Sequence, residues 1–97
     1  MLVKDAARNE QIARLTIKSW DEAIKLDPNF EDAWYNRAIF LSNMSRFEEA
    51  VQNSDMALEL NPRDAAAWAN KARFLMALER YEEAIPAYDN ALRLCGQ

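Results

Sequence analysis

The stretch EDAWYNRAIFLSNMSRFEEAV, residues 31–51, decides the fold because the chain contains a second, similar copy of it. The second copy lies within RDAAAWANKARFLMALERYEEAI, residues 63–85, and the two align at a constant offset of 34 residues. Small and apolar residues recur at this offset: Trp34 as Trp68, Ala38 as Ala72, Leu41 as Leu75, Ala50 as Ala84 and Ala57 as Ala91. Self-similarity at a fixed period indicates a repeat array, in which each unit packs mainly on its neighbours.

Each copy has the residue spacing of helices. Trp34, Ala38 and Leu41 lie at i, i+4 and i+7, which places them on one side of a helix with 3.6 residues per turn. Strand-like alternation is absent, and residues that favour helices fill most positions. The sequence therefore predicts an all-α fold of five helices. These include one long helix over 3–26, either unbroken or broken at Asn9, and the first helices of the two repeats over about 31–44 and 65–78.

Prolines and a glycine set the predicted helix ends. Pro28 and Pro62 disfavour helix at the residue before them, so the preceding helices should stop there. The sequence SRFE at 45–48 has the pattern of a capping box and predicts the start of the next helix. Because Pro86 cannot donate a backbone hydrogen bond, the last helix should be bent or start late. Gly96 should cap its end.

The repeated unit resembles the tetratricopeptide repeat. That family's signature is a tryptophan, small residues at two helix crossings and a terminal proline, matched here by Trp34, Ala38, Ala50, Ala57 and Pro62. The resemblance implies an α-solenoid, a right-handed superhelix of antiparallel helix pairs. It divides a single domain, residues 1–97, into a half repeat at 3–27, a full repeat at 31–62 and a nearly full repeat at 65–96. Ser45 and Glu79 stand where the family has the glycine of its internal turn.

Composition argues against several partners and compartments. With 12 Lys plus Arg against 16 Asp plus Glu the net charge is −4, so no broad basic face would attract nucleic acid. No stretch reaches the roughly 18 apolar residues that a membrane span needs, and the charged N-terminal sequence does not have the pattern of a targeting segment. The only thiol, Cys95, suits a reducing compartment. We expect a cytoplasmic protein that binds neither nucleic acid nor membrane.

The sequence contains no set of residues suited to catalysis. It has no histidine, no glycine-rich loop and no metal-spaced ligands. The acidic pairs Glu48/Glu49 and Glu82/Glu83 lie where second helices start, and there they favour the helix dipole. We therefore predict a non-enzymatic protein without catalytic residues, metal or cofactor.

The aromatic residues and the polar residues of the repeats fall on different sides of the predicted helices. By spacing, the core should contain Trp34, Phe40, Leu41, Phe47, Trp68, Phe74, Leu75 and Tyr81. In the tetratricopeptide family the first helices of the repeats line a concave surface where peptides dock. The resemblance therefore implies a peptide-binding groove formed by Asp32, Tyr35, Asn36, Ile39, Asn43, Ala66, Ala69, Asn70, Arg73 and Ala77.

Within this groove, asparagine amides and one arginine are the candidate recognition groups. Asn36 and Asn70 each offer donors and an acceptor to a peptide backbone, and Arg73 is the cation best placed for a carboxylate. Carboxylate-clamp relatives would need a lysine and an arginine at positions 66 and 70, where this chain has Ala66 and Asn70, so an acidic chaperone tail is not expected. Arg37 and Lys71, where the family usually has leucine, should extend along the groove rim.

A second interpretation is a self-assembling structural unit or a piece of a longer array. The end helices carry apolar strips, one with Ile12, Ile17, Trp20 and Ile24 and the other with Ile85, Tyr88, Leu92 and Leu94. Exposed apolar patches usually mark interfaces. We therefore expect self-association through Trp20, Ile24, Tyr88 and Leu92. Contacts between like ends would give the homodimer that we favour, whereas a head-to-tail contact would give a filament.

Overall fold

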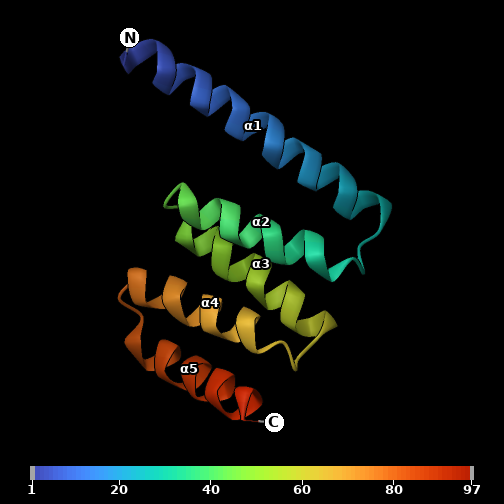
Figure 1. The fold of residues 1–97 in the computed structure, drawn as a ribbon, viewed down its shortest axis with the longest axis vertical. Coiled ribbons are helices and arrows are strands. Elements are labelled where there is room, and N and C mark those ends of the chain that lie inside the picture. The colour runs from blue at the N-terminus through green and yellow to red at the C-terminus, as the bar shows by residue number, and fades with distance from the viewer. Residues whose placement is uncertain (1, 97) are drawn as a thin grey trace.

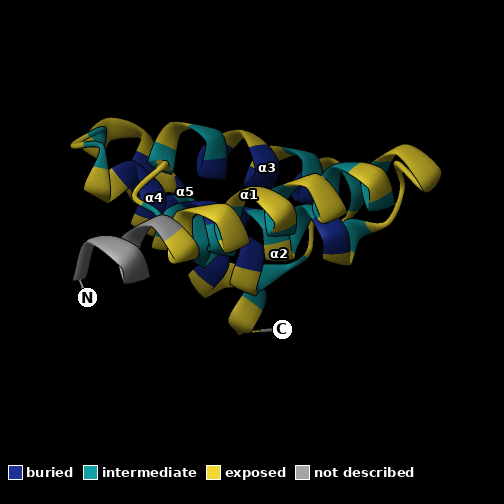
Figure 2. Cartoon of the chain, turned by 90° about the horizontal axis from the view of Figure 1, so that it is seen from above, coloured by how far each residue is buried: buried dark blue, intermediate teal, exposed yellow. Residues whose placement is uncertain are grey.

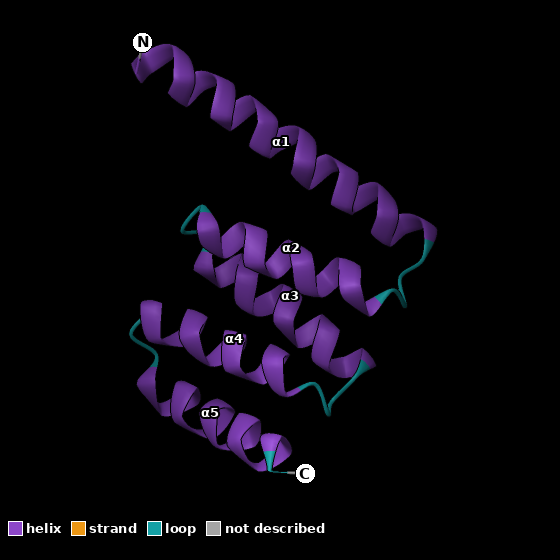
Figure 3. Ribbon diagram, in the orientation of Figure 1, coloured by secondary structure: helices purple, strands orange, loops and turns teal. Residues whose placement is uncertain are grey.

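The computed structural model describes the backbone of residues 2–96 and the side chains of residues 8–96. This part of the chain forms five helices and no strand: α1 (Leu2–Leu26), α2 (Glu31–Asn43), α3 (Phe47–Leu60), α4 (Ala65–Ala77) and α5 (Tyr81–Cys95). The helices follow one another as antiparallel neighbours in a single stack, with α1 at one end and α5 at the other (Figures 1 and 3). The predicted all-α fold and its five helices are confirmed.

The ends of the helices agree with the repeat, with one correction. The helix α1 is continuous through its N-terminal half, and α5 contains Pro86 yet begins at Tyr81, 34 residues after the start of α3 at Phe47. A late start of the last helix was therefore the wrong alternative. Gly96 caps α5 as predicted, although in a right-handed helical conformation rather than the left-handed one that favours glycine.

The core lies between α2, α3, α4 and α5. Its largest fully buried side chains are Phe74, Leu41 and Leu75. Around them the helices approach closely at buried alanines, namely Ala38, Ala50, Ala57, Ala72, Ala84 and Ala91. The helix α1 contributes less, and its described residues are exposed or half-buried in Figure 2.

The predicted aromatic core is partly wrong. Tyr81 is 50% exposed, and Trp34 and Trp68 are only half-buried. Each tryptophan instead donates its indole N–H to a loop carbonyl, Trp34 to Pro28 and Trp68 to Pro62, both at 2.9 Å. These rings therefore fasten the start of α2 and of α4 to the preceding loop.

The turn between the two helices of each repeat depends on a left-handed residue. Ser45 and Glu79 both have φ of 60°. The helix α3 begins at Phe47 and its N-cap, Arg46, makes no side-chain capping bond, so the predicted capping box at 45–48 does not form. Instead Arg46 forms a two-point ion pair with Glu49 at 2.7 and 2.8 Å. The serine at 45 therefore closes α2 rather than opening α3.

The conformation of these turns predicts that glycine would stabilise the fold. A residue with a Cβ is disfavoured in this region by roughly 1–2 kcal/mol, whereas glycine adopts it freely at some entropic cost in the unfolded chain. Glu79→Gly should therefore raise the free energy of unfolding by about 1 kcal/mol in urea titrations. The matched change Glu22→Gly, at an exposed position inside α1, should lower it by about 1 kcal/mol. A loss of stability in Glu79→Gly would contradict this account of the turn.

Candidate peptide-binding face

The ten predicted groove residues lie on one side of α2 and α4. None of them is buried: Asp32, Asn36, Asn43, Ala66, Arg73 and Ala77 are exposed, and Tyr35, Ile39, Ala69 and Asn70 are half-buried. Two other sides of each helix are turned inward, because Arg37 reaches α1 and Lys71 reaches α3 while Leu41 and Leu75 enter the core. The helical spacing leaves the predicted residues on the remaining side. We call this surface the α2/α4 face.

A hydrogen-bonded chain connects the two repeats across this face. The Asn70 amide nitrogen donates to the Tyr35 hydroxyl at 3.1 Å, and Arg73 Nη1 donates to the Asn70 carbonyl oxygen at 3.0 Å. Asn70 therefore uses part of its donor and acceptor capacity in hydrogen bonds within the protein. The sequence did not reveal this link, because it depends on how closely α2 and α4 lie.

The two other asparagines of the face, Asn36 and Asn43, are both exposed. Asn36 is exposed, and its amide makes no hydrogen bond to another described residue. Arg73 is exposed and uses one of its five N–H groups on Asn70, which leaves a fork of donors for a carboxylate. Asn36, Asn43 and Arg73 are thus exposed polar groups of the face that keep unused hydrogen-bonding capacity.

The start of the face is acidic. Asp64 caps α4 by accepting from the Ala67 N–H at 3.1 Å. A hydrogen bond between the side chains of Glu31 and Asp64 raises the pKa of Glu31, and partial burial and the charge of Asp64 act in the same direction. Together with Asp32, these groups give the face one acidic end, whereas its cation, Arg73, lies two turns further along α4.

Arg37 and Lys71 do not lie at the groove rim as predicted. Arg37 forms an ion pair with Asp21 of α1 at 2.6 Å, and Lys71 forms one with Asp55 of α3 at 2.7 Å. Both cations therefore link one repeat to the helix before it. The correction follows from helix geometry, because residues 37 and 71 lie one residue after 36 and 70 and so point about 100° away from them.

The described surface has two shallow hollows away from the α2/α4 face. One is lined by residues 79–83 at the turn before α5, and the other by Pro62, Trp68, Asn90, Arg93 and Leu94. In the first, Arg80 pairs with Glu83 at 2.6 Å and with Glu48 at 3.0 Å. The hydrogen bond from Arg80 lowers the pKa of Glu83, which is the reverse of what a general acid at neutral pH requires. These ion pairs link the turn before α5 to the first turn of α5 and to α3.

The described residues contain no group of three or more side chains of the kinds that hold metal ions. No described helix combines the length and the apolar character needed to cross a membrane.

The self-association residues fall into two different environments. Tyr88 and Leu92 are exposed on α5, whereas Trp20 and Ile24 are half-buried on the side of α1 that carries Asp21 and faces α2. Ile17, on the same side of α1, packs against the core cluster. Of the predicted strip on α1, Ile12 is exposed and the other three residues are half-buried. Among the side chains of α1 that the structure describes, Leu15 and Leu26 are the further large apolar ones that are exposed.

Stacked antiparallel helix pairs with a 34-residue period and an exposed polar face define an α-helical repeat protein. Models of the tetratricopeptide repeat match residues 19–52 and residues 41–97. The chain belongs to the tetratricopeptide repeat family. The resemblance stated from the sequence is thereby confirmed.

Solved structures with the same fold include two MamA proteins and a domain of yeast Sti1. MamA AMB-1 is 24% identical with a TM-score of 0.83, and the match covers 91% of this chain and 52% of that one. For MamA MSR-1 the identity is 23%, the TM-score 0.83 and the coverage 91% and 51%. The TPR2B domain of yeast Sti1, solved as a complex with pHsp70, is 26% identical with a TM-score of 0.79 and coverage of 93% and 72%.

The present chain thus spans about half the length of the MamA chains. No curated protein matches it. The MamA structures support the fold, and the Sti1 complex shows that a similar domain has been solved with a bound partner.

Proposed function

We propose that the chain is a non-enzymatic protein–protein interaction module that binds a peptide segment along the α2/α4 face. The observation that carries the proposal is the exposed row itself, where Asn36 and Arg73 retain unused hydrogen-bonding capacity beside the hydrogen-bonded link between Tyr35 and Asn70. Membership of the tetratricopeptide repeat family and the bound partner of the Sti1 domain support the same class of function.

The face favours an extended peptide with an acidic group. A backbone amide of the peptide can exchange hydrogen bonds with the Asn36 side chain, and a carboxylate can take the free donors of Arg73. The acidic end near Glu31 and Asp32 disfavours a second carboxylate at that end of the bound peptide. Because only two repeats present the face, we expect Kd values about micromolar or weaker.

Selection from a displayed library of random peptides, followed by titration of the selected peptides, tests this proposal. The recovered peptides should share an acidic residue. Arg73→Glu should weaken them by about tenfold or more, and Asn36→Ala by less, with no loss of melting temperature. Lys18→Glu, which reverses an exposed cation on α1, is the matched control and should leave binding unchanged.

Two results would contradict the proposal. One is a set of peptides that binds Arg73→Glu as tightly as the unaltered chain. The other is binding that drops equally in Lys18→Glu, which would indicate a general charge effect rather than recognition at the face.

Self-association is the second candidate function, favoured by the exposed apolar side chains Tyr88 and Leu92 on α5. A dimer through these residues should have about twice the 11.2 kDa mass of one chain, and Leu92→Glu should convert it to monomers. Light scattering that gives the mass of one chain up to millimolar concentration would exclude it.

A further inference from the structure

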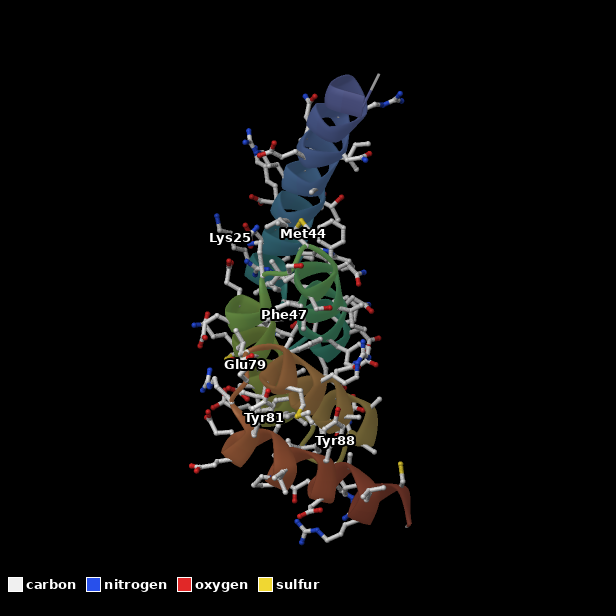
Figure 4. The ribbon with its side chains drawn as sticks, turned by 90° about the vertical axis from the view of Figure 1, so that its left-hand side faces the viewer. Lys25, Met44, Phe47, Glu79, Tyr81 and Tyr88 are labelled. Atoms are coloured by element: carbon white, nitrogen blue, oxygen red, sulfur yellow. The ribbon has the colours of Figure 1, made fainter. Side chains whose placement is uncertain are left out.

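Three helices each carry a row of four residues at equivalent positions of the 34-residue repeat. The rows are Ala13, Ile17, Trp20 and Ile24 in α1; Phe47, Val51, Ser54 and Leu58 in α3; and Tyr81, Ile85, Tyr88 and Leu92 in α5. Each row has the spacing i, i+4, i+7 and i+11 and so lies on one side of its helix. We call the last set the α5 row; Figure 4 shows Tyr81 and Tyr88 on α5 and Phe47 on α3.

These rows differ in what covers them. Val51 and Leu58 of α3 are 5% and 7% exposed, and α4 packs against this helix. The α1 row is half-buried beside α2. In contrast, Ile85 and Leu92 of the α5 row are 61% and 71% exposed. The α5 row therefore repeats a surface that the fold elsewhere covers with a helix.

An aspartate beside each row identifies how the covering helix is held. Asp21 of α1 pairs with Arg37 of α2, and Asp55 of α3 pairs with Lys71 of α4. Asp89 of α5 occupies the same position in the next period, is exposed, and forms no ion pair with another described residue. The α5 row therefore lies beside an aspartate whose equivalents in α1 and α3 each form an ion pair with a cation of the covering helix.

The covering helices in turn share a pattern. In α2 and its cap the residues are Ala33, Arg37, Phe40 and Met44, and in α4 and its cap they are Ala67, Lys71, Phe74 and Leu78. Ala67 and Phe74 are buried, and Met44 and Leu78 pack against the core cluster. A helix suited to this kind of surface therefore has alanine, then a basic residue four positions on, phenylalanine at seven and methionine or leucine at eleven.

We propose that the α5 row and Asp89 form a docking site for a helix of a partner protein that carries this pattern. The apolar side chains of that helix would cover Ile85 and Leu92, and its lysine or arginine would pair with Asp89. A second copy of this chain fits less well. In such a copy, the helices with this pattern, α2 and α4, already pack against α1 and α3. The exposed apolar residues of its α1, Ile12 and Leu15, do not belong to a segment with the pattern.

A peptide copy of α4 is a suitable probe because it already contains the pattern. A labelled peptide of residues 63–80 would be titrated into the intact chain and followed by fluorescence anisotropy. An isolated helix of this length is marginal in water, so we expect a Kd of about micromolar or weaker. Asp89→Lys, at an exposed position, should weaken binding by about tenfold, whereas the control Glu22→Lys on α1 should not change it.

Reversal of both charges gives the decisive comparison. A peptide with Lys71→Glu should bind the Asp89→Lys chain better than it binds the unaltered chain. Binding indifferent to Asp89→Lys would mean that the peptide replaces α4 on α3, and would overturn the proposal. The proposal would also be overturned by a dimer that dissociates in the Leu92→Glu variant and whose formation excludes the peptide. A second copy of the chain would then occupy the site. Arg73→Glu in the intact chain should not change its affinity for the peptide, which distinguishes this site from the α2/α4 face.

Discussion

Phe74→Ala should lower the free energy of unfolding by about 3–5 kcal/mol. Phe74 is 2% exposed and is among the largest fully buried side chains of the described chain. It packs in the cluster with Leu41, Leu75 and Val51, so its removal leaves a cavity between helices of both repeats. Since small domains are stable by only about 5–15 kcal/mol, urea denaturation followed by circular dichroism should show a large decrease in the midpoint.

The control for this change is Phe40→Ala, at the same position one period earlier. Phe40 is half-buried, because the helix that covers its side of α2 is α1, which packs less extensively than α3 does on α4. Phe40→Ala should therefore cost clearly less than Phe74→Ala. Equal losses in the two variants would show that α1 covers α2 more completely than the structure indicates.

The repeat period was enough to predict the helices and much of the core from the sequence. Pro28 and Pro62 stop helices for local reasons, and the alanines of the helix crossings recur at every period. The tryptophans were harder to place, because spacing puts Trp34 and Trp68 on the inward stripe but does not show that each ring lies at its edge, against a loop carbonyl. Ranking Phe74 above Trp68 required the packed helices.

The turn at Ser45 and the α2/α4 face also show which features the sequence predicts and which require the structure. A capping-box pattern describes one short segment, whereas the reversal between α2 and α3 needs a left-handed residue, and Ser45 supplies it. For the face, helical spacing placed all ten residues on one side. The bond from Asn70 to Tyr35 and the ion pairs of Arg37 and Lys71 depend on side-chain reach between neighbouring helices, which one-dimensional spacing does not contain.

Ala72→Leu should destabilise the fold by about 1–3 kcal/mol, although leucine is the more hydrophobic residue. Ala72 is fully buried at a crossing of α4, and the closely packed helices leave no space for three more carbon atoms without moving the backbone or straining side chains.

The matched variant is Ala77→Leu, which adds the same atoms at an exposed position in the last turn of the same helix. It should change stability by no more than about 0.5 kcal/mol. Ala38→Leu, at the corresponding crossing of α2, should behave like Ala72→Leu, because Ala38 is also buried. If Ala72→Leu were as stable as Ala77→Leu, the small residues at the period of 34 would not be there to let the helices approach, and close packing at the crossings would no longer explain the repeat.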